Sequence, residues 1–322
     1  MESGTSRCGK APLSGYRVPL TREAEKGFLH LSTRIATHGL GAMLCAMIKN
    51  LPRHTKLVLA LLAFVPVYFI IAALGTKLGV WGWQFGLMTL TFFGGMIVLG
   101  ATALAAVVSL VLAARMTPRH NGLIAAAILG LAVPGAALVM FMAAGSKAGD
   151  NPIHDISTDT GNPPTFSAET LAVREAAGAN PVSDYQLPLG QIEPYRTAFA
   201  RMDEPSPLAV KSHAQIITAR KDRPAPLPLG GAGKAEGVAA VRAAMAAMGL
   251  SDIRADEESG MVEGVATTFW FGFKDDVVAR VGDSQIDFRS VSRVGVSDIG
   301  ANTARIVDLR ARTEALLGAA SR

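Results

Sequence analysis

The chain has 322 residues, a formal net charge of +5, 50% hydrophobic residues and 18% charged residues. The charged fraction is lower than in an average soluble domain, which suits a protein that is part membrane and part globular. The basic excess is concentrated near the hydrophobic runs, where lysine and arginine act as topology signals, and it does not indicate nucleic-acid binding. We therefore expect no nucleic-acid partner.

Three hydrophobic runs, 57–74, 85–114 and 123–144, contain no Asp, Glu, Lys or Arg. A helix needs about 20 apolar residues to cross roughly 30 Å of hydrocarbon, so each run is predicted to be a transmembrane helix. Transporters usually carry ionisable groups within the membrane, and their absence from the runs argues against a conduction pathway. We expect a membrane anchor over 56–146, with the lipid bilayer as partner and small residues that permit a homo-oligomer.

The orientation follows from the lysines and arginines of the short loops. The stretch before the first run holds nine of them, the loop 76–84 holds only Lys77, and the loop 115–120 holds Arg115 and Arg119. Cytoplasmic loops carry the excess of these residues, so the N-terminus is predicted to be cytoplasmic. Three crossings then place everything after the third run on the opposite side. We expect an inner (plasma) membrane protein with a periplasmic C-terminal domain.

The cytoplasmic tail, 1–55, contains both cysteines, Cys8 and Cys45, so the exported domain has no thiol for disulfides or metal binding. Two interpretations of its first 42 residues stay open. Met43 and Met47 lie just before the first run, which is consistent with a misassigned start. Alternatively, residues 28–44 form a weakly amphipathic segment on the inner leaflet.

The exported part divides into an extended, Pro-rich segment, 147–228, and a compact α+β domain, 229–322. Helical spacing of apolar residues predicts helices over 234–248 and 301–317. Runs rich in β-branched and aromatic residues predict four strands between them: these are 254–257, 261–270, 277–281 and 285–292. We expect a four-stranded antiparallel sheet with two covering helices, in which Trp270, Phe271 and Phe273 belong to the core.

The last two strands are predicted to form a hairpin with Asp283 and Ser284 in the turn. That register places Val281 opposite Ile286 on one face and Arg280 opposite Asp287 on the other. One face of the hairpin is then apolar, and the other pairs opposite charges.

Three stretches of the exported part carry a family resemblance: IHDISTDTGNPP (153–164), WFGFKDDVVARV (270–281) and IDFRSVSRVGVSDIGANTARI (286–306). Together they resemble the domain of unknown function family 1499 over about 152–317. The resemblance implies an exported domain, often behind membrane helices, with no established activity, substrate or cofactor. Relatives carry a cysteine-containing motif where this chain has 153–164, so thiol chemistry is not expected here.

The third stretch contains the first candidate site, a corner in which three arginines converge near the start of the last helix. Guanidinium groups and free backbone N–H groups favour phosphate or carboxylate, so the corner is a candidate anion site: its residues are Arg289, Arg293, Arg305, Ser297 and Asn302. The alternative is structural. Ser297 or Asp298 then caps the helix, and the arginines pair with Asp276, Asp287 and Asp298.

The second candidate site consists of His154, Asp155 and Asp159, a general acid or base set or part of a metal site. The alternative is a turn whose side chains cap backbone N–H groups. The spacing signals no metal site and no cofactor.

Two functions from different classes follow. The first is a non-enzymatic module that binds an envelope protein or an anionic or lipidic ligand, and we favour it. The second is an envelope hydrolase using His154 with Asp155 or Asp159, which requires these side chains to meet in a cleft.

Overall fold

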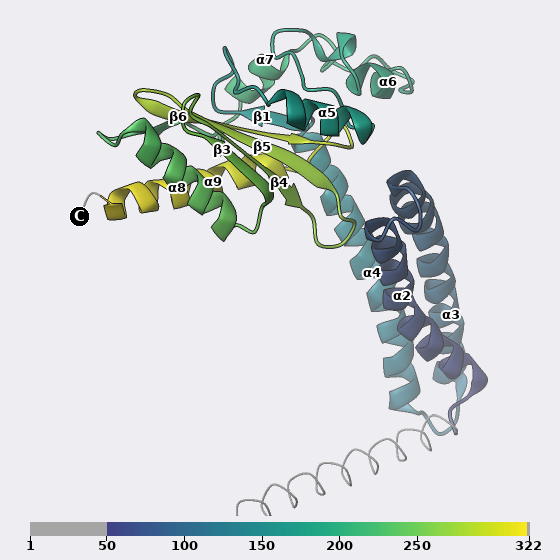
Figure 1. Cartoon of the computed structure of the whole chain (residues 1–322). Helices are drawn as coiled ribbons and strands as arrows, with labels where there is room; N and C mark the ends of the chain where they lie inside the picture. Colours follow the sequence, from purple (N-terminus) through teal and green to yellow (C-terminus); the bar gives the residue numbers. More distant parts are fainter. Residues whose placement is uncertain (1–49, 321–322) are drawn as a thin grey trace, which may run out of the picture. The chain divides into compact units, whose positions relative to one another are not determined.

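The computed structural model describes residues 50–320. Both interpretations of the first 42 residues concern positions outside this range. Three helical segments are long and apolar enough to cross a membrane. They are α2 (Arg53–Lys77), the π-helical η1 (Gln84–Gly94) continued by α3 (Gly95–Arg115), and α4 (Asn121–Asp150) (Figure 1).

The helices α3 and α4 pack closely through small residues. A Cβ atom built on Gly130 of α4 would lie 2.7 Å from Val58 and 2.8 Å from Ala106, so only glycine allows this approach. The Tyr68 hydroxyl of α2 donates a hydrogen bond of 2.8 Å to the Leu90 carbonyl oxygen of η1. The buried positions of α3 are mostly small residues, as the composition of this run predicts, whereas α2 also buries larger residues such as Val58 and Val65.

The domain after α4 is built on an antiparallel sheet of six strands in the order β1-β6-β5-β4-β3, with β2 also paired to β6. The expectation of four strands was therefore wrong. The strands are β1 (Asp155–Ser157), β2 (Leu227–Pro228), β3 (Ser251–Asp256), β4 (Met261–Thr267), β5 (Lys274–Val281) and β6 (Gln285–Ser292). The two additional strands, β1 and β2, are too short to show an alternating pattern, and they exist because β6 offers them a free edge.

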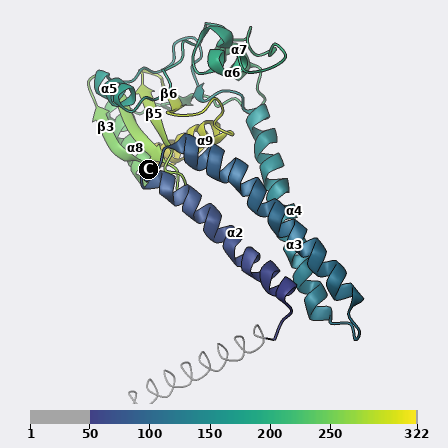
Figure 2. The ribbon, with the colours of Figure 1, turned by 90° about the vertical axis from the view of Figure 1, so that its right-hand side faces the viewer.

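Two layers of helices cover the sheet (Figures 1 and 2). On one face lie α8 (Lys234–Ala247) and α9 (Ala301–Ala320), which pack on the apolar side chains of β5 and β6. The other face lies beneath α5 (Ala168–Ala176) and the chain around it. Short helices η2 (Leu189–Gln191), α6 (Tyr195–Phe199) and α7 (His213–Thr218) complete the domain.

The segment 147–228 is not a separate extended arm in the structure. Its residues Ile153, Ile156, Tyr185, Leu189 and Tyr195 are all almost fully buried in the same core as α8 and α9. These residues are spaced irregularly between prolines and turns, so no helical or strand periodicity predicted their burial.

The predicted hairpin is confirmed at every position. Val281 pairs with Ile286, and Arg280 pairs with Asp287, with the Arg280 guanidinium 3.2 Å from the Asp287 carboxylate. The helix expected over 234–248 is also confirmed, and Gly249 follows it with a φ of +75°, a conformation in which glycine commonly ends helices.

The aromatic residues expected in the core lie instead in the loop between β4 and β5. Phe269 is 69% exposed and Trp270 is 52% exposed. Phe271 and Phe273 stack on each other with their ring centroids 5.3 Å apart. The strand β4 ends at Thr267, before the aromatic run, because the Phe273 carbonyl accepts from the Thr268 N–H and closes the loop at 2.8 Å.

Candidate functional site

Two histidines and a tyrosine form a buried cluster between β1 and the short helices. His154 precedes β1, Tyr195 begins α6 and His213 begins α7. The Tyr195 hydroxyl lies 2.6 Å from His154 Nδ1 and 3.2 Å from His213 Nε2, and it accepts a hydrogen bond of 3.0 Å from the His154 backbone N–H. The three side chains are 0–1% exposed. Tyr195, which joins the two histidines, was not among the residues predicted from sequence.

Both histidines are neutral in this cluster. Burial lowers the pKa of His154 to about 3 and that of His213 to about 4. The Tyr195 hydroxyl has one proton, so it donates a hydrogen bond to one imidazole ring and accepts a hydrogen bond from the other. The remaining ring nitrogens, His154 Nε2 and His213 Nδ1, are buried and have no hydrogen-bond partner among residues 50–320. Neither ring reaches solvent, so a substrate in solution does not meet them.

Asp155 is held by a set of hydrogen bonds that fills its carboxylate. Arg289 donates from Nε at 2.9 Å and from Nη2 at 2.7 Å, and the Tyr185 hydroxyl donates at 2.6 Å. The Ser183 N–H adds a fourth bond at 3.1 Å. Burial opposes ionisation, but the charge and hydrogen bonds of Arg289 outweigh it and hold the pKa of Asp155 well below its usual range. A carboxylate accepts about four bonds, so Asp155 has no capacity left for a proton or a metal ion.

Asp159 lies in a different environment from His154 and Asp155. Its Oδ1 accepts from the N–H groups of Gly161 at 3.0 Å and Asn162 at 2.9 Å, and its Oδ2 pairs with Arg280 at 3.0 Å. Asp159 therefore caps a turn, as the alternative interpretation of this motif states. Within residues 50–320, no group of three or more His, Cys, Asp and Glu side chains is arranged to hold a metal ion.

The three arginines of the predicted corner point to three different carboxylates. Besides the pair of Arg289 with Asp155, Arg293 makes two bonds to Asp276, at 2.9 and 2.6 Å. Arg305 bonds to Asp275 at 2.6 Å. The carboxylate of Asp276 is shared with Arg174, an arginine of α5 that the sequence did not single out. The three guanidinium groups are thus paired with carboxylates of the same domain. Of the three arginines, Arg293 is the one that lines a small pocket of about 230 Å³.

The other corner residues support the start of α9. The Asn302 side chain is fully buried and donates to the His154 carbonyl at 2.8 Å and to the Ser292 hydroxyl at 3.0 Å. The Asp298 carboxylate accepts from the N–H groups of Gly300 at 2.8 Å and Asn302 at 2.7 Å. Burial raises the pKa of Asp298. The Asp298 cap and the Arg293–Asp276 pair match the structural alternative, but Arg289 and Arg305 pair with Asp155 and Asp275 and not with the expected Asp287 and Asp298. The anion site stays a prediction.

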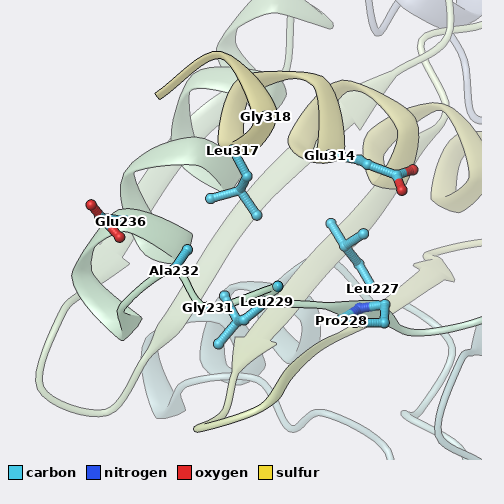
Figure 3. A pocket seen from close by; sticks show the side chains of 10 residues that line it. Leu227, Pro228, Leu229, Gly231, Ala232, Glu236, Glu314, Leu317 and Gly318 are labelled. Atoms are coloured by element: carbon cyan, nitrogen blue, oxygen red, sulfur yellow. The ribbon is translucent and has the colours of Figure 1, made fainter. Parts of the chain in front are cut away.

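A larger opening lies elsewhere, between the chain that follows β2 and the ends of α8 and α9 (Figure 3). Its volume is about 610 Å³, within the range of ligand pockets. Leucine side chains and glycine backbone form most of the lining, with two glutamates among them: Leu227, Pro228, Leu229, Gly230, Gly231, Ala232, Glu236, Glu314, Leu317 and Gly318. This pocket was not predicted from the sequence. The signal available for it was a short pattern, two leucines around a proline followed by glycines.

Comparison with known proteins finds a family match over the sheet domain. A family described as "Protein of unknown function (DUF1499)" matches residues 155–312, from the first residue of β1 into α9. No curated protein and no solved structure matches the chain. The match covers all six strands, α8 and the first part of α9, and it includes Tyr195, His213 and the arginines, whereas His154 lies one residue ahead of it. The chain is a member of the DUF1499 family, with apolar helices ahead of the family's domain.

Proposed function

We propose that the protein is a non-enzymatic binding module anchored in the cytoplasmic membrane, with its sheet domain on the outer side. The distribution of lysine and arginine before α2 and between α3 and α4 supports this orientation. The pocket of about 610 Å³ carries the proposal, because it is open and lined in part by leucine side chains, whereas the His154 and Asp155 side chains are fully buried.

The geometry does not favour the hydrolase alternative. His154 and Asp155 are 0% exposed, and Asp159 is occupied by a turn and by Arg280. A general base must come within hydrogen-bond reach of the proton that it takes, directly or through one water. A substrate would reach His154 only after α6 and α7 had moved away.

The lining of the pocket indicates the class of ligand. Leu227, Leu229 and Leu317 offer apolar contact along its length (Figure 3). Glu236 accepts a hydrogen bond of 2.8 Å from the Gly233 N–H, and Glu314, 58% exposed, pairs with Arg310 at 3.0 Å. Two carboxylates disfavour an anion. The ligand is therefore an apolar chain with a cationic or neutral polar group.

Native mass spectrometry of the full chain, released from micelles, tests this function. Dodecylamine, dodecanol and dodecanoate share one alkyl chain and differ in the charge of the head group. We expect adducts in the order amine, alcohol, carboxylate, because the two glutamates attract the cation and repel the anion.

Two neighbouring leucines of α9 provide a matched pair of variants. Leu317→Trp fills the pocket and should abolish the adduct, whereas Leu316→Trp changes a side chain that is 39% exposed outside the pocket lining and should not. The proposal is overturned if no probe binds, or if both variants bind the amine as the unmodified protein does.

A further inference from the structure

The register of the sheet shows which end of the domain faces the membrane. Asp155 pairs with Val291, Val291 pairs with Asp276, and Asp276 pairs with Val265, so these four residues form one row across β1, β6, β5 and β4. The chain arrives from α4 at one side of this row. The loop between β4 and β5 leaves the row on the same side.

The two paths from the row have equal lengths. Five positions separate Asp155 from Asp150, where α4 ends, and five separate Val265 from Trp270 in the loop. Extended chain covers about 3.3 Å per residue, so each path spans at most about 17 Å. The aromatic loop is therefore long enough to reach the level at which α4 ends.

This end of the sheet exposes large apolar side chains next to Lys274, whereas the opposite end exposes acidic ones. The β4–β5 loop exposes Phe269 and Trp270 by 69% and 52%, and the connection from β6 to α9 exposes Val296 and Ile299 by 38% and 49%. We call these four residues the apolar rim. At the other end, the turns 257–260 and 282–284 expose Glu257, Glu258 and Asp283 instead.

The rim also contacts the end of the apolar helix α2. Lys77 closes α2, and its ammonium group donates to the Phe269 carbonyl at 2.7 Å and lies 4.7 Å from the centre of the Phe269 ring. A lysine at the end of a transmembrane helix extends its ammonium group into the head-group layer. Phe269 is thereby placed at the same depth.

We propose that the apolar rim is a membrane-contact surface, which seats the sheet domain on the phospholipid head-group layer and inserts Phe269 and Trp270 at its apolar boundary. Tryptophan and other aromatic residues prefer this layer, because they present an apolar ring and a polar edge together. Burying these side chains in lipid removes the exposed apolar surface that the folded domain leaves at this end. The proposal rests on membrane insertion of the three helices and not on the pocket or its ligand.

Spin labels on the full chain test the proposal. The cysteines Cys8 and Cys45 are first replaced by serine, and a single label is then placed by Phe269→Cys or, as the matched control at the polar end, by Asp283→Cys. The protein is reconstituted in phosphatidylethanolamine and phosphatidylglycerol vesicles, and co-flotation with the vesicles verifies insertion of the helices. The measurement is the ratio of label accessibility to oxygen and to a water-soluble nickel chelate.

We expect a ratio several-fold higher at position 269 than at position 283, since oxygen concentrates in lipid and the chelate in water. Equal ratios in co-floating protein would overturn the membrane contact while leaving the anchor and the pocket intact. A second measurement uses the native chain. The part of the tryptophan emission lost on Trp270→Phe should be quenched by brominated lipids, and an unquenched Trp270 component also refutes the proposal.

Discussion

The buried pair of Asp155 and Arg289 is the most informative place to perturb the domain. Arg289→Met keeps a long side chain but removes both bonds to the carboxylate, at 2.9 and 2.7 Å. It also removes the bonds from the guanidinium to the carbonyl oxygens of Pro164 and Ser183, both at 3.1 Å. The Asp155 carboxylate, 0% exposed, then remains as a buried charge without a counter-ion.

Breaking a buried ion pair from one side costs about 3–5 kcal/mol, because the remaining charge is uncompensated. We expect Arg289→Met to fall in this range, since the Tyr185 hydroxyl and the Ser183 N–H still donate to Asp155 but carry no charge. Arg312→Met is the matched control. The Arg312 pair with Asp308 is 2.9 Å long and about half exposed on both sides, and such a pair contributes about 0.5 kcal/mol or less.

Pulse proteolysis of the full chain in micelles, over a urea series, measures both variants. With a denaturant dependence of about 2 kcal/mol per M, a loss of 4 kcal/mol lowers the midpoint by about 2 M. The control should move by less than about 0.3 M. The double variant Arg289→Met with Asp155→Leu should recover part of the loss, because it removes the stranded charge. If Arg289→Met moves the midpoint no more than the control, the reasoning is refuted.

Three further outcomes are expected in the same assay. The pKa values of His154 and His213 in the folded chain lie below the usual 6.5, so the unfolded chain binds more protons and the free energy of unfolding falls as the pH is lowered below 6.5. By pH 5 each histidine lowers the free energy of unfolding by about 2 kcal/mol, and an unchanged urea midpoint between pH 7 and 5 would contradict this. Gly260→Ala should destabilise the domain by about 2 kcal/mol or more, since Gly260 has a φ of +76° and a Cβ there collides with a backbone carbonyl oxygen of β5. As the control, Gly318→Ala in α9 should not destabilise it, because a Cβ there meets nothing within 4 Å. Asp298→Ala should cost about 1 kcal/mol and Asp298→Asn less, because asparagine also accepts bonds from the N–H groups at the start of a helix.

The parts of the fold that were predictable from sequence are those whose patterns are local and long. The three long apolar helices follow from uninterrupted apolar runs, and α8 follows from Val238, Val241 and Met245 at helical spacing, all three of them buried. The hairpin register followed from one turn, because a shift by one residue would have turned Phe288 and Ile286 away from the core.

The parts that were not predictable depend on contacts between distant residues. The strands β1 and β2 have three and two residues and borrow their pairing from β6. His154 meets Tyr195 41 positions later, and Asp155 meets Arg289 134 positions later, so neither contact leaves a local pattern. One signal was available. Tyr185 and Tyr195 are two of only four tyrosines in the chain, and both lie in an otherwise polar, Pro-rich segment where a large ring has little reason to occur unless it is buried.

The backbone at Ile299 supplies an independent reason to place the apolar rim against lipid. Ile299 has a φ of +55°, which is a strained conformation for a β-branched residue and costs on the order of 1–3 kcal/mol. Its side chain is 49% exposed, so the folded domain recovers only part of that cost by packing. Asparagine or glycine would suit this position better if the domain were surrounded by water. An isoleucine there is favourable once its exposed half is buried in the membrane, where apolar area contributes about 25 cal/mol per Å².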